Sequence, residues 1–274
     1  MNQKVLLLGG TGFVGNAIKD SLSQAYQLIV TAGHHEVDGG YQLRAEEPDH
    51  LLEILEKEDP KIVISSIRGD FQAQYQFHQT LADWLRGRSK KLLFISTANV
   101  FDGDLSRPWT EEARPNPGSD YGKFKRDCEE MLTQKLSEQL IILRIPSVWA
   151  PECPRIQTLR QHSANGEPLP AYPNDYVNVT LASQVGAFAA YVLENDLSGI
   201  FHVGSVDTVD YFAFQKMVCE LLGLKMPVFA PEEIPEKVFQ AVLPARAEIP
   251  DSLQLTVAQV LEALQTAPAS KNDH

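Results

Sequence analysis

Two kinds of hydrophobic pattern alternate along the first 145 residues of the chain. Short, almost continuously apolar runs are typical of strands buried on both faces, and longer stretches with apolar residues on one side are typical of amphipathic helices. Alternation at this spacing predicts an α/β fold, a Rossmann-type doubly wound parallel sheet. The expected strands cover residues 4–8, 28–32, 61–65, 91–96 and 139–144, and the expected helices cover 48–58, 72–86 and 121–136.

Prolines interrupt this alternation after residue 146. Six of them stand between residues 146 and 173, and a second proline-rich stretch follows residue 226, so loops and a small lobe are expected there. The alternation partly resumes with a helix over 181–194, a strand over 199–203 and helices over 211–222 and 256–265. We predict a dinucleotide-binding Rossmann domain over residues 1–150, re-entered at about 177–204, a small C-terminal substrate-binding lobe from 151–176 and 205–266, and a frayed tail over 267–274.

Charge and cysteine content narrow the classes of function. The 274 residues carry 36 acidic and 24 basic side chains, a formal charge of −12, and such a surface repels nucleic acid and anionic membranes. Three cysteines without C-x-x-C spacing predict neither a disulfide framework nor a zinc site, and the histidines fall at no ligand spacing, so no metal is expected. No apolar run reaches the length of a membrane span and no leader pattern is visible, so we expect a cytoplasmic protein.

A glycine-rich turn follows the first expected strand. The letters GGTGFVG contain the spacing G-x-G-x-x-G and lead into a helical pattern that starts near Val14. Glycines let a pyrophosphate approach the backbone, and the N–H groups at the start of the helix meet its charge. A turn that serves only tight packing is the alternative. The residues expected to hold a dinucleotide here are Gly9, Thr11, Gly12, Phe13, Val14 and Gly15.

The end of the second expected strand bears on the choice of nicotinamide cofactor. An acid at this place usually binds the ribose 2′-hydroxyl of NAD and repels a 2′-phosphate. Here the chain reads Gly33, His34, His35, with no acid before Glu36. A histidine could donate to a phosphate, or both histidines could be solvated loop residues. We therefore expect NADP or NAD, with a slight preference for NADP and with His34 in the cofactor site.

Three residues form a candidate catalytic set. Tyr121 and Lys125 stand four residues apart on an expected helix, so their side chains point the same way. A nearby ammonium can lower the pKa of a phenol, which makes Tyr121 a candidate general acid, and Lys125 could also hold a ribose hydroxyl. Thr97 follows a central strand, where ligands lie in open α/β sheets, and could donate to a substrate carbonyl. It could instead only cap a turn, and the Tyr and Lys pair could be surface residues without a role.

Several segments carry a family resemblance that extends from about residue 4 to 223. They are ISTANVFDGD, the stretch from PWTEEARP to DYGKFK, LIILRIPSVWAP and GIFHVGS. Together with the glycine turn they resemble the extended short-chain dehydrogenase/reductase superfamily, and within it the dTDP-4-dehydrorhamnose reductase and NAD-dependent epimerase families. The resemblance implies hydride transfer at a nicotinamide, with Thr97, Tyr121 and Lys125 as the catalytic residues.

The resemblance also implies further site residues. Ser65, Ser66, Arg68 and Ile145 are expected beside the cofactor, together with Tyr121 and Lys125. The substrate is expected to contact Ala98, Asn99, Val100 and Ser147. Two of these depart from the family pattern, because Ala98 replaces a common aspartate and Ser147 replaces a substrate-facing tryptophan.

The resemblance favours one activity and leaves two alternatives. The expected activity is NAD(P)H-dependent reduction of a carbonyl on a sugar nucleotide or another modified sugar. A sugar-nucleotide epimerase that retains its NAD is one alternative, and a non-catalytic, cofactor-binding regulatory subunit is the other. The expected partner is a small molecule rather than nucleic acid or membrane, and a homodimer is possible because helices of this fold commonly supply dimer faces.

Overall fold

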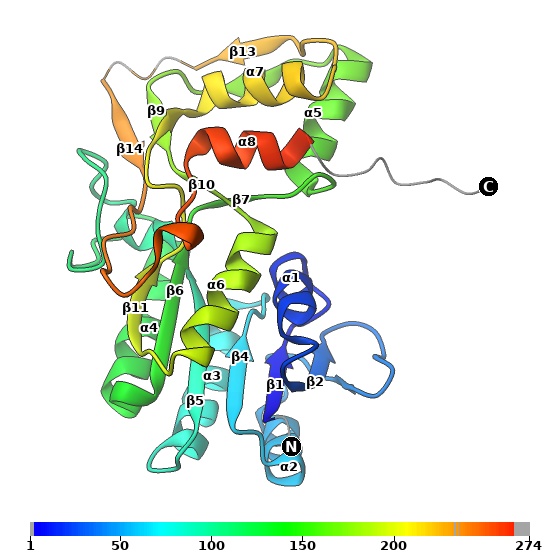
Figure 1. Cartoon of the computed structure of the whole chain (residues 1–274), viewed down its shortest axis with the longest axis vertical. Helices are drawn as coiled ribbons and strands as arrows, with labels where there is room; N and C mark the ends of the chain where they lie inside the picture. The colour runs from blue at the N-terminus through cyan, green and yellow to red at the C-terminus, as the bar shows by residue number, and fades with distance from the viewer. Residues whose placement is uncertain (1–2, 233, 235, 266–274) are drawn as a thin grey trace.

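The structure, a computed structural model, describes residues 3–232, 234 and 236–265 and contains a seven-stranded sheet with helices on both faces (Figure 1). All neighbouring strands in this sheet are parallel, in the order β11-β6-β5-β4-β1-β2-β3. The predicted Rossmann-type fold is therefore confirmed. The strands are β1 (Lys4–Leu8), β2 (Gln27–Ala32), β3 (Tyr41–Gln42), β4 (Ile62–Ser65), β5 (Lys91–Thr97), β6 (Leu140–Ile145) and β11 (Gly199–His202).

The central strands are mostly apolar because helices cover both faces of the sheet. In β1, Leu6 and Leu8 belong to one buried cluster, whereas Val5 and Leu7 belong to another. The first cluster is shared with α2 (Pro48–Glu58), α3 (Phe71–Leu85) and α4 (Asp120–Leu136). The second is shared with α1 (Phe13–Leu22) and α6 (Ala182–Glu194), which also pack against each other.

A third buried cluster lies beyond the carboxyl ends of the strands and includes Trp149, Ile156 and Phe214. Three helices and short strands surround it, at the top of Figure 1. Whether these segments form a separate substrate-binding lobe stays a prediction, and the tail 267–274 lies outside the described residues. The helices are α5 (Pro154–Asn165), α7 (Tyr211–Leu221) and α8 (Val257–Gln265); the strands are β7 (Ser147–Trp149), β8 (Leu169–Ala171), β9 (Asp175–Val177), β10 (Val179–Leu181), β12 (Val209–Asp210), β13 (Phe229–Pro231) and β14 (Val238–Gln240).

The expected helices and strands agree with the structure to within one residue at each end. The expectation of loops over 151–176 was incomplete, because α5 lies in this proline-rich stretch. Pro154 occupies the first turn of α5, where a missing N–H costs nothing. The sequence pattern also missed the 3₁₀ helices η1 (Ala98–Phe101), η2 (Ser137–Gln139) and η3 (Asp251–Leu253).

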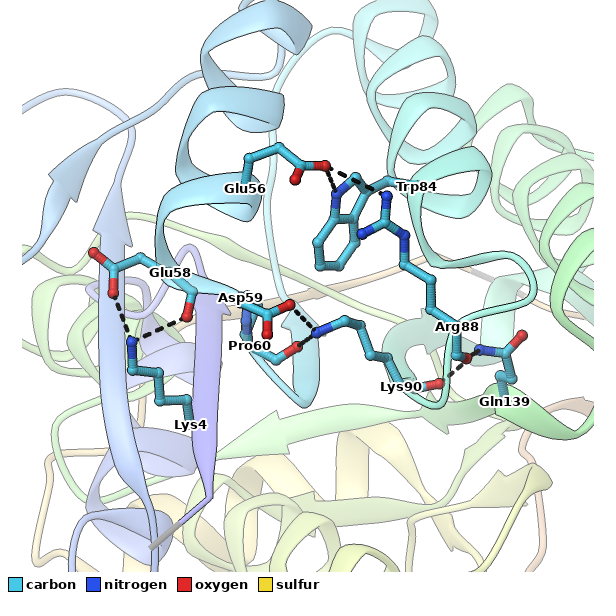
Figure 2. A network of polar contacts seen from close by, with 9 residues as sticks. All are labelled: Lys4, Glu56, Glu58, Asp59, Pro60, Trp84, Arg88, Lys90 and Gln139. Atoms are coloured by element: carbon cyan, nitrogen blue, oxygen red, sulfur yellow. Dashed lines mark hydrogen bonds and ion pairs between the residues drawn. The ribbon is translucent and has the colours of Figure 1, made fainter. Parts of the chain in front are cut away.

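Polar contacts connect the amino ends of the central strands (Figure 2). Lys90, buried just before β5, donates from Nζ to Asp59 Oδ1 at 2.6 Å and to the Pro60 carbonyl at 2.7 Å. Gln139, just before β6, donates to the Lys90 carbonyl at 2.8 Å. These contacts connect the amino-terminal ends of the strands. In open α/β sheets ligands bind at the opposite ends of the strands, the carboxyl ends. The network also contains Lys4, Glu56, Glu58, Trp84 and Arg88.

The cysteines of the chain form no disulfide, and the described residues contain neither a candidate metal cluster nor a helix suited to a membrane span. Cys128, Cys153 and Cys219 are free and buried. Within that part of the chain, no group of three acidic, histidine or cysteine side chains could hold a metal ion. None of the helices described there combines the length and the hydropathy that a membrane span requires.

Candidate active site

One large cavity, of about 1210 Å³, opens at the carboxyl ends of the central strands. Its wall begins at the glycine turn between β1 and α1, continues through the ends of β4, β5 and β6, and reaches β9, α7 and β14. Ligand sites in open α/β sheets lie at the carboxyl ends of the strands. Cavities that hold one drug-sized ligand usually have a volume of about 300–1,000 Å³. The volume is therefore large enough for a dinucleotide together with a substrate.

The glycine turn forms the first part of the cavity wall. Gly9 has a φ of +74°, and a Cβ on this residue would lie 3.0 Å from the Ser66 carbonyl oxygen. A Cβ on Gly15 would lie 2.2 Å from the carbonyl oxygen of Gly9, so neither position has room for a side chain. No described side chain caps α1, which leaves the N–H groups of its first turn for an anion. The turn therefore fits the pyrophosphate of a nicotinamide dinucleotide.

Thr31 on β2 fixes this turn and was missed by the sequence analysis. The Gly9 N–H donates to Thr31 Oγ1 at 3.1 Å, and the Gly10 N–H donates to the Thr31 carbonyl at 3.0 Å. From the other side, the Ser66 hydroxyl donates to the carbonyl of Gly9 at 3.2 Å. The backbone of the turn is thus held by β2 and by the end of β4.

Beyond the turn, the cavity wall contains Gly33, His34, His35 and Arg44. A Cβ on Gly33 would meet no atom within 4 Å, so space is open where the sequence lacks an acid. Arg44, which follows β3, is half-exposed, and its Nε lies 3.7 Å from Glu47 Oε2. Sequence reasoning missed Arg44 because it stands ten positions beyond His34 and carries no motif.

Thr97 is the last residue of β5 and is buried. Its Oγ1 accepts from the Asn99 N–H at 3.2 Å and donates to Asn99 Oδ1 at 2.9 Å, so it caps η1. Hydrogen bonding by Thr97 also lowers the pKa of Tyr121, whose side chain lines the same cavity. Thr97 therefore combines the capping role with a position beside the candidate general acid.

The electrostatics of Tyr121 differ from the expectation. Burial raises the pKa of Tyr121 above its ordinary value, and the groups that oppose this rise are Thr97 and Arg68 rather than Lys125. The ammonium of Lys125 instead lies beside β5, in the middle of the sheet, where Nζ donates to the Ile95 carbonyl at 3.0 Å. The expected lowering of the Tyr121 pKa by Lys125 is therefore wrong for this structure, and Tyr121 keeps its proton at neutral pH.

Lys125 is buried near the aromatic rings of the core. Its Nζ lies 4.5 Å from the centre of the Phe94 ring. Burial lowers the pKa of Lys125 to about 8, the charges of Cys128 and Glu129 oppose this change, and the Arg68 charge adds to it. Lys125 is consequently a buried cation that loses its proton more readily than an exposed lysine.

The loop after β4 and the start of α3 place two further side chains in the cavity wall, Arg68 and Phe71. Arg68 lines the cavity, and its charge lowers the pKa of both Tyr121 and Lys125, the candidate catalytic residues. Phe71 stacks on Phe124 with ring centres 4.8 Å apart, and its ring centre lies 5.9 Å from that of Tyr121. Phe71 was missed, because an aromatic residue at the start of a helix is ordinarily a core residue.

Two of the predicted site residues do not line the cavity. Ser65 is buried, and its Oγ lies 2.8 Å from His78 Nε2 under α3. Val100 is fully buried and packs against Phe101 and Val242. The roles of the other predicted residues stay predictions, but the structure brings them together in one wall: Gly9, Thr11, Gly12, Phe13, Val14, Gly15, His34, Ser66, Arg68, Thr97, Ala98, Asn99, Tyr121, Lys125, Ile145 and Ser147.

The fold and this site place the chain among the extended short-chain dehydrogenase/reductase proteins, as the sequence resemblance indicated. More closely, it belongs to the RmlD substrate binding domain family, whose model matches residues 3–271. It is 23% identical over 242 residues to the dTDP-4-keto-6-deoxy-D-glucose reductase of Streptomyces niveus, covering 81% of this chain and 80% of that protein. It is also 22% identical over 237 residues to the probable low-salt glycan biosynthesis reductase Agl14 of Haloferax volcanii, covering 78% and 79%.

Solved structures share the fold at low sequence identity. One is the dTDP-4-dehydrorhamnose reductase of Bacillus anthracis in complex with NADP, with a TM-score of 0.80, 17% identity and coverage of 97% of each chain. At this identity the likeness establishes the fold. Together with the family membership, it supports an oxidoreductase that uses a nicotinamide cofactor.

Proposed function

We propose that the chain is an NAD(P)H-dependent reductase of a ketone carbonyl on a sugar nucleotide. One observation carries this proposal: a single cavity contains both a glycine cradle for a dinucleotide and the Thr97, Tyr121 and Lys125 side chains. The family membership supports the same reaction class. Sugar-nucleotide reductases among the relatives support the substrate class.

Each side chain has a role in the proposed reaction. A bound nicotinamide supplies the hydride. Tyr121 donates its phenolic proton to the carbonyl oxygen as negative charge develops there, and the Thr97 hydroxyl, which donates to Asn99 Oδ1 in this structure, turns its proton to the same oxygen. Lys125 uses one N–H on the Ile95 carbonyl, and its other donors hold ribose hydroxyls. The Arg68 charge stabilises the phenolate that remains on Tyr121.

The proposal is tested by mixing purified protein with NADPH and a panel of nucleotide-linked 4-keto sugars. We expect the absorbance of the reduced nicotinamide to fall in proportion to the alcohol formed. Epimerised product with no net consumption of cofactor would show a cofactor-retaining epimerase instead. Binding of NADPH without any conversion across the panel would contradict the reductase and favour a regulatory role.

We further propose that NADP is preferred over NAD. Support comes from the open space at Gly33 and from Arg44 and His34 in the same part of the wall. Arg44→Ala is expected to raise the KM for NADPH about tenfold and to leave the KM for NADH nearly unchanged, because a charge-assisted bond to phosphate is lost. Steady-state kinetics with both cofactors measure this. Arg160→Ala, which removes an exposed arginine paired with Glu152, is the control, and equal changes for NADH and NADPH would contradict the assignment.

A further inference from the structure

A buried carboxylate in the cavity wall lacks a partner for one of its oxygens. Asp175, the first residue of β9, is 5% exposed and lines the cavity. Its Oδ2 accepts from Gln240 Nε2 at 3.0 Å, whereas Oδ1 has no hydrogen-bond partner among the described residues. An unsatisfied buried acceptor is costly, and a carboxylate more so than a neutral group.

No described cation compensates this carboxylate. The groups that act on it lie on two neighbouring strands: burial and the charge of Asp210 on β12 raise the pKa of Asp175 to about 6, and the hydrogen bond from Gln240 on β14 opposes the rise. Arg155 on α5 lines the same cavity, but its charge acts on Tyr211 and is not among the groups that shift Asp175. At neutral pH, Asp175 is therefore mostly ionised in the wall of the cavity, and no described cation is paired with it.

The hydrogen bond from Gln240 does not explain why a carboxylate is buried at position 175, because the fold does not need this bond to join the two strands. Strands β9 and β14 already pair through their backbones, with Val238 opposite Asp175. The turn before β9 is held by other groups, since the Asn174 N–H donates to Asp210 Oδ2 at 2.7 Å. A structural role would use both oxygens or a neutral residue, so the free oxygen points to a ligand.

We propose that Asp175 and Gln240 recognise the nucleobase of the substrate, an inference that rests on the proposed function. Oδ1 of Asp175 is an acceptor. Gln240 donates one N–H of its amide to Asp175 Oδ2, and the amide has a second N–H donor and a carbonyl acceptor. An acceptor next to an amide matches the adjacent donor and acceptor on the edge of a base. Tyr211 and Phe239 line this part of the cavity as flat apolar neighbours, and Arg155 is the cation there for the diphosphate.

The first test uses dTDP, which carries a base and a diphosphate but no sugar to reduce. By calorimetry, Asp175→Asn is expected to weaken dTDP binding about tenfold or more, because a hydrogen bond to a charged acceptor is lost. Binding of inorganic pyrophosphate should not change. Asp196→Asn, a matched substitution at an exposed ion pair with Lys91, should alter neither affinity. Equal loss for dTDP and pyrophosphate would overturn base recognition by Asp175.

A second test separates a ligand role from a structural one without any ligand. A carboxyl group whose pKa is higher in the folded state than in the unfolded state stabilises the fold at low pH and loses that contribution as pH rises through its folded value. The melting temperature of Asp175→Asn relative to the unsubstituted protein should therefore increase between about pH 4 and about pH 7. A variant that is less stable by the same amount across this range would show a structural role and contradict the proposal. Asp175-dependent dTDP binding without turnover would uphold it even if the reductase activity failed.

Discussion

Tyr121→Phe is expected to lower kcat about 10²- to 10⁴-fold while the KM for NADPH changes little, because general acid catalysis by a positioned side chain contributes this much. The substitution removes only the phenolic hydroxyl and keeps the ring that packs beside Phe71 and Phe124. The glycine turn, which we propose to bind the cofactor, is a separate part of the wall of the same cavity. Steady-state kinetics with NADPH and the best substrate of the panel measure both parameters.

The pH profile gives an independent check of this assignment. Because burial raises the pKa of Tyr121, the phenol stays protonated at neutral pH and the reduction should persist into the alkaline range. The matched control is Tyr191→Phe on helix α6. It removes a hydroxyl that donates to the Glu248 carbonyl and should keep full activity. If Tyr121→Phe retained more than half of the rate, Tyr121 would not be the proton donor.

The sequence predicted those parts of the fold that depend on local patterns. Strand β1 is apolar from Val5 to Leu8 because one set of these side chains packs under α1 and α6 and the other under α2, α3 and α4. Whereas the lack of room at Gly9 comes from Ser66 after β4, the spacing of the glycines and the lack of room at Gly15 beside the Gly9 carbonyl are local. Such features leave a pattern within a window of about 20 residues, which sequence reasoning can detect.

The features that sequence reasoning missed arise from contacts between distant segments. Asp175 and Gln240 are 65 positions apart and meet only because β9 and β14 pair. Ser65 and Ser66 are neighbours, yet adjacent side chains of an extended chain point to opposite faces, so Ser65 meets His78 and Ser66 meets Gly9. The position of Lys125 also depends on a distant segment, because its Nζ on α4 donates to the carbonyl of Ile95 on β5.

A buried ion pair connects α4, which carries the candidate catalytic residues Tyr121 and Lys125, to the sheet. Glu129, one turn beyond Lys125 on α4, accepts from Arg144 of β6, with Nη2 at 2.6 Å from Oε2. Both side chains are almost completely buried, and the hydroxyl of Ser96, next to Thr97, also donates to Glu129. Burial and the Arg144 charge lower the pKa of His202 to about 3, so the imidazole is neutral beside Arg144.

Arg144→Met is expected to lower the free energy of unfolding by about 3–5 kcal/mol, because it leaves the Glu129 carboxylate buried without a cation. Guanidinium unfolding measures this, and Arg160→Met, at the exposed pair with Glu152, should change the free energy by less than about 1 kcal/mol. Adding Glu129→Met to Arg144→Met should restore much of the loss, since the uncompensated charge is then gone. A double variant as unstable as the sum of the two single variants would show that the two charges do not depend on each other. In that case the ion pair would not be what fixes α4, and with it Tyr121 and Lys125, against β5 and β6.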